Sequence, residues 1–290
     1  MKVSKLGLAA AMAMVAGAAH ALSVPWQLNM TPGVTETSRT VYGIHMIGLT
    51  VCCVIGVLVF GAMFYAMFKF RKSKGVKPAT WSHNTVAEII WTVVPILTLT
   101  VLAWPATNVM IKMAYTEDSQ MTVKITGYQW KWGYDYLNWG DKPYHVHFIS
   151  KLDAASDKTR QLKSGLDPFA VKQGDEQTYL LDVDHPLVLP TDTKIRFVVT
   201  GDDVIHAWWV PQLGWKQDAI PGIINDAWTN IHDPGLYRGQ CAELCGQDHG
   251  FMPIVVKAVP KDEFVKWLDE QEVAMKPATT VAPAAAPTAG

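Results

Sequence analysis

Charged residues and cysteines are both scarce in this chain. Asp, Glu, Lys and Arg make up 18% of the 290 residues, and no charged residue occurs at positions 41–68 or 89–111. The formal net charge is −1, so there is no basic excess and we expect no nucleic-acid partner. The chain has four cysteines and no Cys-x-x-Cys-His sequence, which excludes a covalently attached c-type haem.

The two uncharged runs predict a membrane anchor. Each exceeds the roughly 20 residues that a helix needs to cross a bilayer, and we expect transmembrane helices at 41–68 and 86–113. The intervening loop, 69–85, carries five basic and no acidic residues, which places it on the cytoplasmic side. The N-terminal segment 22–40 and the residues after 113 then lie on the exported side.

The first residues have the pattern of a secretory signal. Lys2 and Lys5 precede a short apolar run from Leu6 to Ala18, and Ala19-His-Ala21 fits a cleavage site. We therefore expect a signal peptide at 1–21. The alternative is an uncleaved N-terminal anchor, although the apolar run is short for a membrane span.

Residues 114–260 contain short alternating segments separated by Gly, Pro, Asp and Asn, a pattern that predicts short strands joined by turns. Met121, Val123 and Ile125 alternate with polar residues. Five aromatic residues from Tyr128 to Tyr136 recur at every second position, which predicts one extended segment with its rings on one face. Further strands are expected at 178–183, 194–200, 204–210, 235–240 and 253–259. This pattern favours an all-β sandwich or barrel.

Two other segments differ from this pattern. Residues 141–177 are polar and poorly periodic, and predict a long excursion between strands. Residues 261–290 predict a short helix followed by an Ala/Pro-rich tail that cannot bury a core. The exported segment 114–260 holds 19 acidic and 13 basic residues. Such a charge attracts a basic partner, or it serves solubility alone.

The cysteine-rich segment near the C-terminus carries the strongest chemical pattern. Cys241, Cys245, His249 and Met252 lie within twelve residues, and His206 lies upstream in Asp-Val-Ile-His-Ala-Trp. Sulfur and imidazole ligands suit copper or zinc, and the thioether favours copper. A mononuclear blue-copper site uses one thiolate. A second thiolate on the same loop can bridge two copper ions, with one imidazole for each, which suits electron transfer.

Zinc and a disulfide are the alternatives at this segment. Two Cys and two His satisfy a structural zinc site, but the usual two close-spaced pairs are absent and Met252 would have no role. A disulfide between Cys241 and Cys245 is the ordinary expectation in an oxidising compartment, but it leaves His249 and Met252 unexplained. Cys52 and Cys53 lie in the first apolar run, where thiols act as small hydrophobic side chains.

The segment from Gly239 to Ile254, together with the His206 segment, resembles the copper-binding motifs of cytochrome c oxidase subunit 2. The resemblance implies a cupredoxin domain with a binuclear copper (CuA) centre. Cys241 and Cys245 would bridge both ions. His206 and Met252 would complete one copper, and His249 with the backbone carbonyl of Glu243 the other. The Glu243 side chain would bind Mg²⁺ shared with subunit 1.

The same resemblance assigns roles outside the copper loop. Trp130, in Tyr-Gln-Trp-Lys-Trp-Gly-Tyr, would admit the electron from cytochrome c, and Glu88 would form the mouth of a proton path into subunit 1. Asp202, Asp203 and Asp135 would contribute to docking the donor. Tyr128 and Lys131 depart from the family's common His and Tyr, which puts the shape of the docking patch in doubt.

The resemblance therefore implies subunit 2 of a terminal oxidase in a bacterial inner membrane, with its soluble domain in the periplasm. It would work with oxidase subunits 1 and 3 within the membrane lipid, and pass electrons to haem for oxygen reduction coupled to proton translocation. A quinol oxidase subunit would not need the two thiols. The alternative is a membrane-anchored copper chaperone, although such proteins usually have one helix, thioredoxin-like patterning and a His after the cysteines.

Overall fold

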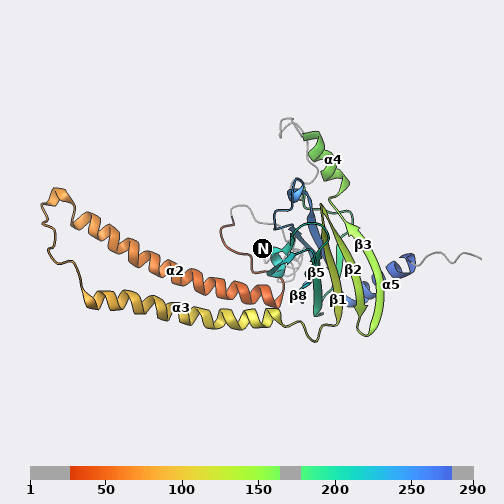
Figure 1. The fold of residues 1–290 in the computed structure, drawn as a ribbon, viewed down its shortest axis with the longest axis horizontal. Helices are drawn as coiled ribbons and strands as arrows, with labels where there is room; N and C mark the ends of the chain where they lie inside the picture. Colours follow the sequence, from red (N-terminus) through yellow and green to blue (C-terminus); the bar gives the residue numbers. More distant parts are fainter. Residues whose placement is uncertain (1–26, 164–177, 276–290) are drawn as a thin grey trace, which may run out of the picture.

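Two long helices and a β-rich domain make up the fold. A computed structural model describes residues 27–163 and 178–275. Helices α2 (Glu36–Lys69) and α3 (Thr85–Ala114) run side by side as an arm that leaves the β domain at one end (Figure 1). The predicted signal peptide 1–21 and the tail from residue 276 lie outside the described residues.

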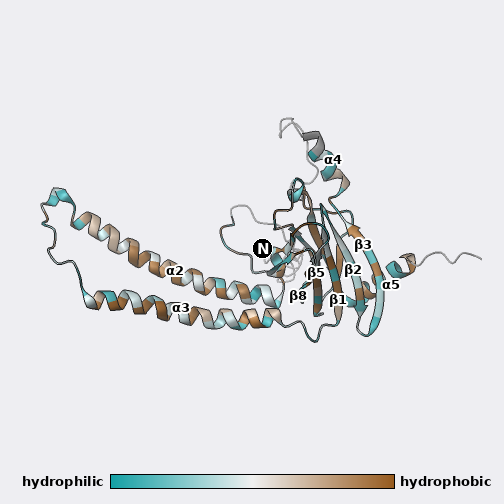
Figure 2. Cartoon of the chain, in the orientation of Figure 1, coloured by the Kyte–Doolittle hydropathy of each residue, from teal (hydrophilic) through white to brown (hydrophobic). Residues whose placement is uncertain are grey.

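The helices of the arm contain the predicted membrane spans. Thr35 caps α2 by accepting a hydrogen bond from the Ser38 amide, and Asn84 caps α3 through the Ala87 amide. Both are long and apolar enough to cross a membrane, since about 30 residues of helix extend roughly 45 Å against a hydrocarbon core of about 30 Å. Apolar residues predominate along the middle of both helices, and the tip of the arm, at the 3₁₀ turn η1 (Lys72–Lys74), is hydrophilic (Figure 2).

The end of the arm nearest the β domain is fastened to that domain. The Thr35 hydroxyl donates to the Leu213 carbonyl (2.8 Å), and the Trp228 indole donates to the Lys112 carbonyl at the end of α3 (3.0 Å). Gly214 has φ +83°, and a Cβ there would lie 2.5 Å from the Ser38 Cα. The start of α2 therefore packs directly on the β domain.

The β domain consists of three groups of paired strands. The largest sheet has the order β3-β2-β1-β5-β8, with β1 antiparallel to β2 and parallel to β5. A second sheet has the order β4-β10-β9, and β6 pairs with β7. The strand bounds are β1 Met121–Tyr128, β2 Lys131–Trp139, β3 Lys142–Ser150, β4 Leu187–Pro190, β5 Ile195–Gly201, β6 His206–Val210, β7 Trp215–Ala219, β8 Asn225–Thr229, β9 Gly235–Gln240 and β10 Pro253–Val259.

Alternating side chains of these strands form one hydrophobic core. Met121, Val123 and Ile125 of β1 are fully buried, as their alternation predicts. The Trp208 ring stacks on those of Phe197 and Trp215 at centroid distances of 5.7 and 5.0 Å. Helix α5 (Lys261–Met275) buries Phe264 and Leu268 against the same core. The predicted fold class, a two-helix transmembrane hairpin followed by an all-β cupredoxin-like domain, is confirmed.

Several strand predictions were wrong in detail. The aromatic run is not one strand, because Gln129 and Trp130 form the turn between β1 and β2, in which Tyr128 pairs with Lys131. Only Trp132, Tyr134 and Tyr136 share the buried face. Residues 178–183 form turns and an isolated bridge at Val183 instead of a strand.

The excursion expected at 141–177 contains regular structure. Residues 142–150 form β3, which buries Tyr144 and Val146, and residues 154–163 form helix α4 (Ala154–Lys163). Residues 164–177 lie outside the described part. The expectation was wrong because polar residues on the exposed face of β3 hide its two-residue alternation. Strands β4, β7 and β8 were not predicted, and each has only four or five residues.

Gly239 of β9 lies where this strand comes close to β6. A Cβ there would lie 2.0 Å from the Trp209 carbonyl oxygen and 2.8 Å from the Val210 Cα, both in β6. We expect Gly239→Ala to lower the free energy of unfolding of the metal-free chain by about 1–3 kcal/mol, the usual cost of overpacking. Thermal denaturation measures the loss. Gly250→Ala is the control, because its Cβ would meet nothing within 4 Å; equal losses in both variants would contradict the steric explanation.

Candidate metal centre

Strands β6 and β9 deliver the central donor atoms at one end of the β domain. The His206, Cys241 and Cys245 side chains are buried, and their donor atoms all lie within 4.8 Å of one another. The two Sγ atoms are 3.9 Å apart, and the Nδ1 atom of His206 lies 4.0 Å from the Cys241 Sγ. A disulfide requires a sulfur–sulfur distance near 2.05 Å, so both thiols are free here.

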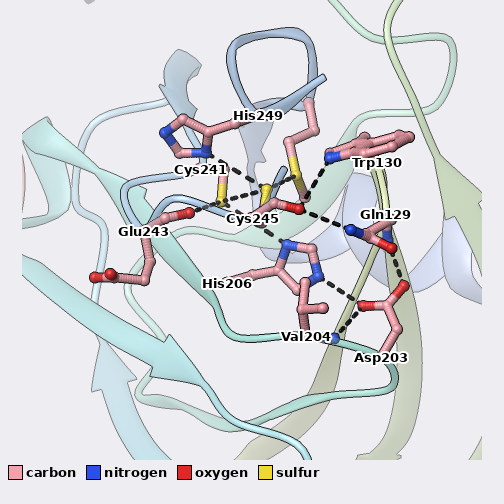
Figure 3. A network of polar contacts seen from close by, with 10 residues as sticks. Gln129, Trp130, Asp203, Val204, His206, Cys241, Glu243, Cys245 and His249 are labelled. Atoms are coloured by element: carbon pink, nitrogen blue, oxygen red, sulfur yellow. Dashed lines mark hydrogen bonds and ion pairs between the residues drawn. The ribbon is translucent and has the colours of Figure 1, made fainter. Parts of the chain in front are cut away.

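The loop between β9 and β10 adds the other predicted donors. The Cys245 Sγ lies 3.4 Å from the Nδ1 of His249 and 3.5 Å from the Sδ of Met252. The Glu243 carbonyl oxygen lies 3.3 Å from the Cys241 Sγ (Figure 3). Each thiol therefore has its own imidazole, and all six predicted metal residues converge.

Local backbone bonds bring this loop back onto the sheets. The Cys241 amide donates to the Met252 carbonyl (3.3 Å), which closes the loop, and the Ala242 amide donates to the Ala207 carbonyl beside His206 (3.0 Å). Gly127 lets β1 approach the imidazole of His206, since a Cβ there would lie 2.8 Å from its Cδ2. The fold thus assembles the donor atoms through protein contacts alone.

A carboxylate fixes the orientation of the His206 ring. Asp203 Oδ1 lies 2.9 Å from the His206 Nε2, which leaves Nδ1 facing the sulfur atoms. The same carboxylate accepts hydrogen bonds from the amides of Gln129 and Val204, both at 2.7 Å. A carboxylate behind a ligating imidazole is a common device for holding its tautomer and orientation. Asp203 was predicted as a docking residue, and the sequence offered only its position three residues before His206 as a signal for this contact.

The two thiols differ in their readiness to ionise. Burial opposes ionisation of Cys241, but the hydrogen bond with His206 and backbone contacts at Glu243 and Ala207 lower its pKa to about 7. Burial and the neighbouring Cys241 raise the pKa of Cys245 to about 12. Two thiolates this close repel each other, so near neutral pH a cation between them would be needed to hold both in the ionised form.

The pKa values of His206 and Asp203 are shifted in the directions that favour their charged forms. Burial would lower the pKa of His206, but its contacts with Cys241 and Asp203 outweigh burial and raise the pKa. Burial would raise the pKa of Asp203, but hydrogen bonds from His206 and two backbone amides lower it. In the metal-free protein these contacts favour a charged row of carboxylate, imidazolium and thiolate.

Trp130 lies directly against the ligand loop. Its indole Nε1 donates to the Cys245 carbonyl (3.2 Å), and the Gln129 side chain donates to the same oxygen (2.9 Å; Figure 3). Gly246 allows this approach, because a Cβ there would lie 3.2 Å from the Trp130 ring. Trp130 is half-buried, so its ring lies between solvent and Cys245, a predicted metal ligand. No sequence pattern indicates the Gln129 contact.

The remaining predicted residues lie away from the sulfur atoms. The Glu243 side chain points out of the cluster, opposite to its carbonyl group (Figure 3). Asp202 is exposed next to the His206 segment, and Asp135 pairs with His147 at 2.8 Å. Glu88 lies at the start of α3, where its Oε1 is 3.2 Å from the Nδ1 of His83.

The unequal thiol pKa values predict a two-step titration of the metal-free chain. In a chain with Cys52 and Cys53 replaced by Ala, thiolate absorbance in the ultraviolet should rise first near pH 7, as Cys241 ionises, and the rise from Cys245 should follow only near pH 12. Adding Cys241→Ser should remove the early step. The assignment fails if both thiols titrate together in the chain that keeps Cys241, or if the early step persists without it.

Two family models match this chain: "Cytochrome C oxidase subunit II, periplasmic domain" over residues 121–259, and "Cytochrome C oxidase subunit II, transmembrane domain" over residues 23–109. A relative from Rickettsia bellii, named probable cytochrome c oxidase subunit 2, is 35% identical over 245 residues, which cover 84% of each chain. Cytochrome c oxidase subunit 2 of Cereibacter sphaeroides is 30% identical over 286 residues, or 96% of this chain and 93% of that protein.

One solved structure resembles the β domain in sequence and extent. It is the periplasmic domain of subunit II of cytochrome oxidase from Bradyrhizobium japonicum, with 36% identity and a TM-score of 0.45, over 55% of this chain and 99% of that one. The two apolar helices followed by a β domain fit a membrane-anchored subunit of a bacterial oxidase. By both family models and by its relatives, the chain belongs to the cytochrome c oxidase subunit II family and is a subunit of a terminal oxidase.

Proposed function

We propose that this chain accepts electrons from cytochrome c at a binuclear copper centre and delivers them to haem in subunit 1, for oxygen reduction coupled to proton translocation. The observation that carries the proposal is the pair of buried sulfur atoms 3.9 Å apart, each with its own imidazole nitrogen within 4.0 Å. One tetrahedral ion needs four ligands, and six donors converge here.

The donor set fits a pair of copper ions. Cys241 and Cys245 would each bind both ions. His206 and Met252 would complete one ion, and His249 with the Glu243 carbonyl the other. Thiolate and thioether ligands select copper over harder metals. Bound copper would supply a one-electron redox couple.

The protein side of the site supports electron transfer rather than substrate chemistry. Cys241, Cys245 and Met252 are at most 5% exposed and His206 is fully buried. Sheet contacts hold their donor atoms before any metal binds, so a change of charge at the metal meets a rigid set of ligands. Trp130 offers the aromatic contact between the surface and the Cys245 carbonyl, which supports its role in admitting the electron.

Other roles follow from position. The outward Glu243 carboxylate is free of the sulfur cluster and would hold Mg²⁺ at the contact with subunit 1. Glu88, at the cytoplasmic end of α3, would take up protons for subunit 1, and subunit 3 would complete the complex. Asp202, Asp203 and Asp135 remain the proposed docking residues, and Asp203 also accepts hydrogen bonds from three donors beside the sulfur cluster.

Copper content and electron paramagnetic resonance test the function directly. The purified full chain should hold two copper ions that share one unpaired electron, with hyperfine structure from both nuclei. Single copper with an ordinary four-line signal, or one zinc, would overturn the proposal. Ready exchange of copper with an acceptor protein would instead support the chaperone alternative.

Asp203 provides a second test. Asp203→Asn keeps the side-chain size but weakens the hold on the His206 ring, and loss of such a partner costs about 10- to 100-fold in metal affinity. We expect the variant to lose copper to a chelator faster by a factor in that range. Asp202→Asn, one residue away and exposed, is the matched control. Equal copper retention in both variants would show that the His206–Asp203 contact has no such role.

A further inference from the structure

Helix α4 holds the ligand loop through one side chain, Arg160. Its Nη1 and Nη2 atoms reach the two carboxylate oxygens of Asp248 at 3.4 and 3.5 Å. Its Nε donates to Asp157 on the same helix (2.8 Å), which aims the guanidinium group at the loop. The guanidinium carbon lies 4.4 Å from the centre of the Phe251 ring. One planar group therefore contacts two loop residues at once.

Both contacted residues adjoin proposed copper ligands. Asp248 immediately precedes His249, and Phe251 immediately precedes Met252. Between them lies the short 3₁₀ turn η3 (His249–Phe251), closed by a hydrogen bond from the Phe251 amide to the Asp248 carbonyl (2.9 Å). Arg160 thus contacts a residue at each end of this turn. A shift of the turn would move the His249 ring and the Met252 sulfur together.

The base of α4 is anchored to the core of the domain. Asp153 caps the helix by accepting hydrogen bonds from the Ala155 and Ser156 amides (2.9 and 3.0 Å), and its own amide donates to the Asp182 carbonyl (3.1 Å). The Asp182 side chain in turn binds Arg238 of β9 at 2.7 and 2.9 Å. Strand β9 leads directly into Cys241, so α4 and the ligand loop share one support.

Partial burial strengthens the ion pair between Arg160 and Asp248. The side chains of Arg160 and Asp248 are 24% and 26% exposed, so solvent screens the pair less than it screens a fully exposed one. Arginine also supplies a planar fork for the carboxylate and a flat face for the aromatic ring, which lysine cannot supply together.

We propose that Arg160 is a positioning residue for the copper centre: through Asp248 and Phe251 it fixes the turn that carries His249 and leads to Met252. The inference rests on the proposed function, because it assumes that these two residues ligate copper. Helix α4, from a segment whose sequence shows no function, then belongs to the electron-transfer apparatus without touching the metal.

The test uses the full chain in the assembled oxidase, with variants Arg160→Gln and Arg160→Lys. Arg196→Gln is the matched control, because Arg196 makes a two-pronged pair with Asp226 (2.8 and 2.9 Å) that does not involve the loop. Three quantities are measured: the copper hyperfine pattern, the midpoint reduction potential, and the rate of copper loss to a chelator. If Arg160 only stabilised the fold, the hyperfine pattern and the midpoint reduction potential would stay unchanged.

We expect Arg160→Gln to change the hyperfine pattern, shift the potential and speed copper loss about tenfold, the lower end for supports of metal ligands. Arg160→Lys should keep most of these changes, because it lacks the fork and the flat face. Arg196→Gln should match the wild type. If Arg160→Gln does not assemble, Asp248→Asn, which keeps the side-chain size and removes only the charge that pairs with Arg160, should shift the same quantities in the same direction.

The outcomes separate this inference from the proposed function. A wild-type chain without two coppers sharing an electron would overturn the proposed function itself. A wild type with that signal, together with Arg160→Gln and Asp248→Asn variants indistinguishable from Arg196→Gln in all three measurements, would overturn only the positioning role of Arg160. Equal changes in the Arg160 and Arg196 variants would also overturn it.

Discussion

The approach of two buried thiols to within 3.9 Å is the constraint on which the rest of the site depends. Such a pair is costly to ionise in a protein interior, as the opposite pKa shifts of Cys241 and Cys245 show. The fold nevertheless holds the sulfur atoms there with two imidazoles and a thioether facing them. This arrangement is understandable where bound cations offset the charge, which is why we place copper between the sulfurs.

The surrounding structure holds this cluster from three sides. Strand β6 supplies His206, whose ring is fixed by Asp203, and the β1–β2 turn presents Gln129 and Trp130 to the Cys245 carbonyl. Helix α4 holds the outer side of the loop. The hydrogen bonds of Thr35 and Trp228 tie the two long helices to the β domain that carries the cluster.

Much of this could be predicted from the sequence. An uncharged run of more than about 20 residues predicts a membrane-spanning helix. The spans predicted at 41–68 and 86–113 lie within α2 and α3. Strands with a long alternating pattern, such as β1 and β5, could also be predicted, because each has one buried face. Five of the predicted metal ligands were recognisable because two thiols, two imidazoles and a thioether are rare together, whereas Glu243 followed only from the family resemblance. The structure brings all six residues together.

The remainder depends on tertiary contacts. Short strands such as β7 and β8 carry too few residues for a period to show, and the turn at Gln129 and Trp130 interrupts an aromatic pattern that looks continuous. In the sequence, Asp203 and Arg160 cannot be told apart from charged residues that simply face solvent. Their contacts with His206 and Asp248, which place them beside the site, are visible only in the structure.

X-ray absorption at the copper and sulfur edges of the reduced, copper-loaded chain tests the central claim most directly. The account predicts that each cysteine sulfur has two copper neighbours, and that each copper has two sulfur neighbours from cysteine and one imidazole nitrogen. Sulfurs bonded to each other, or bound to a single ion, would contradict it.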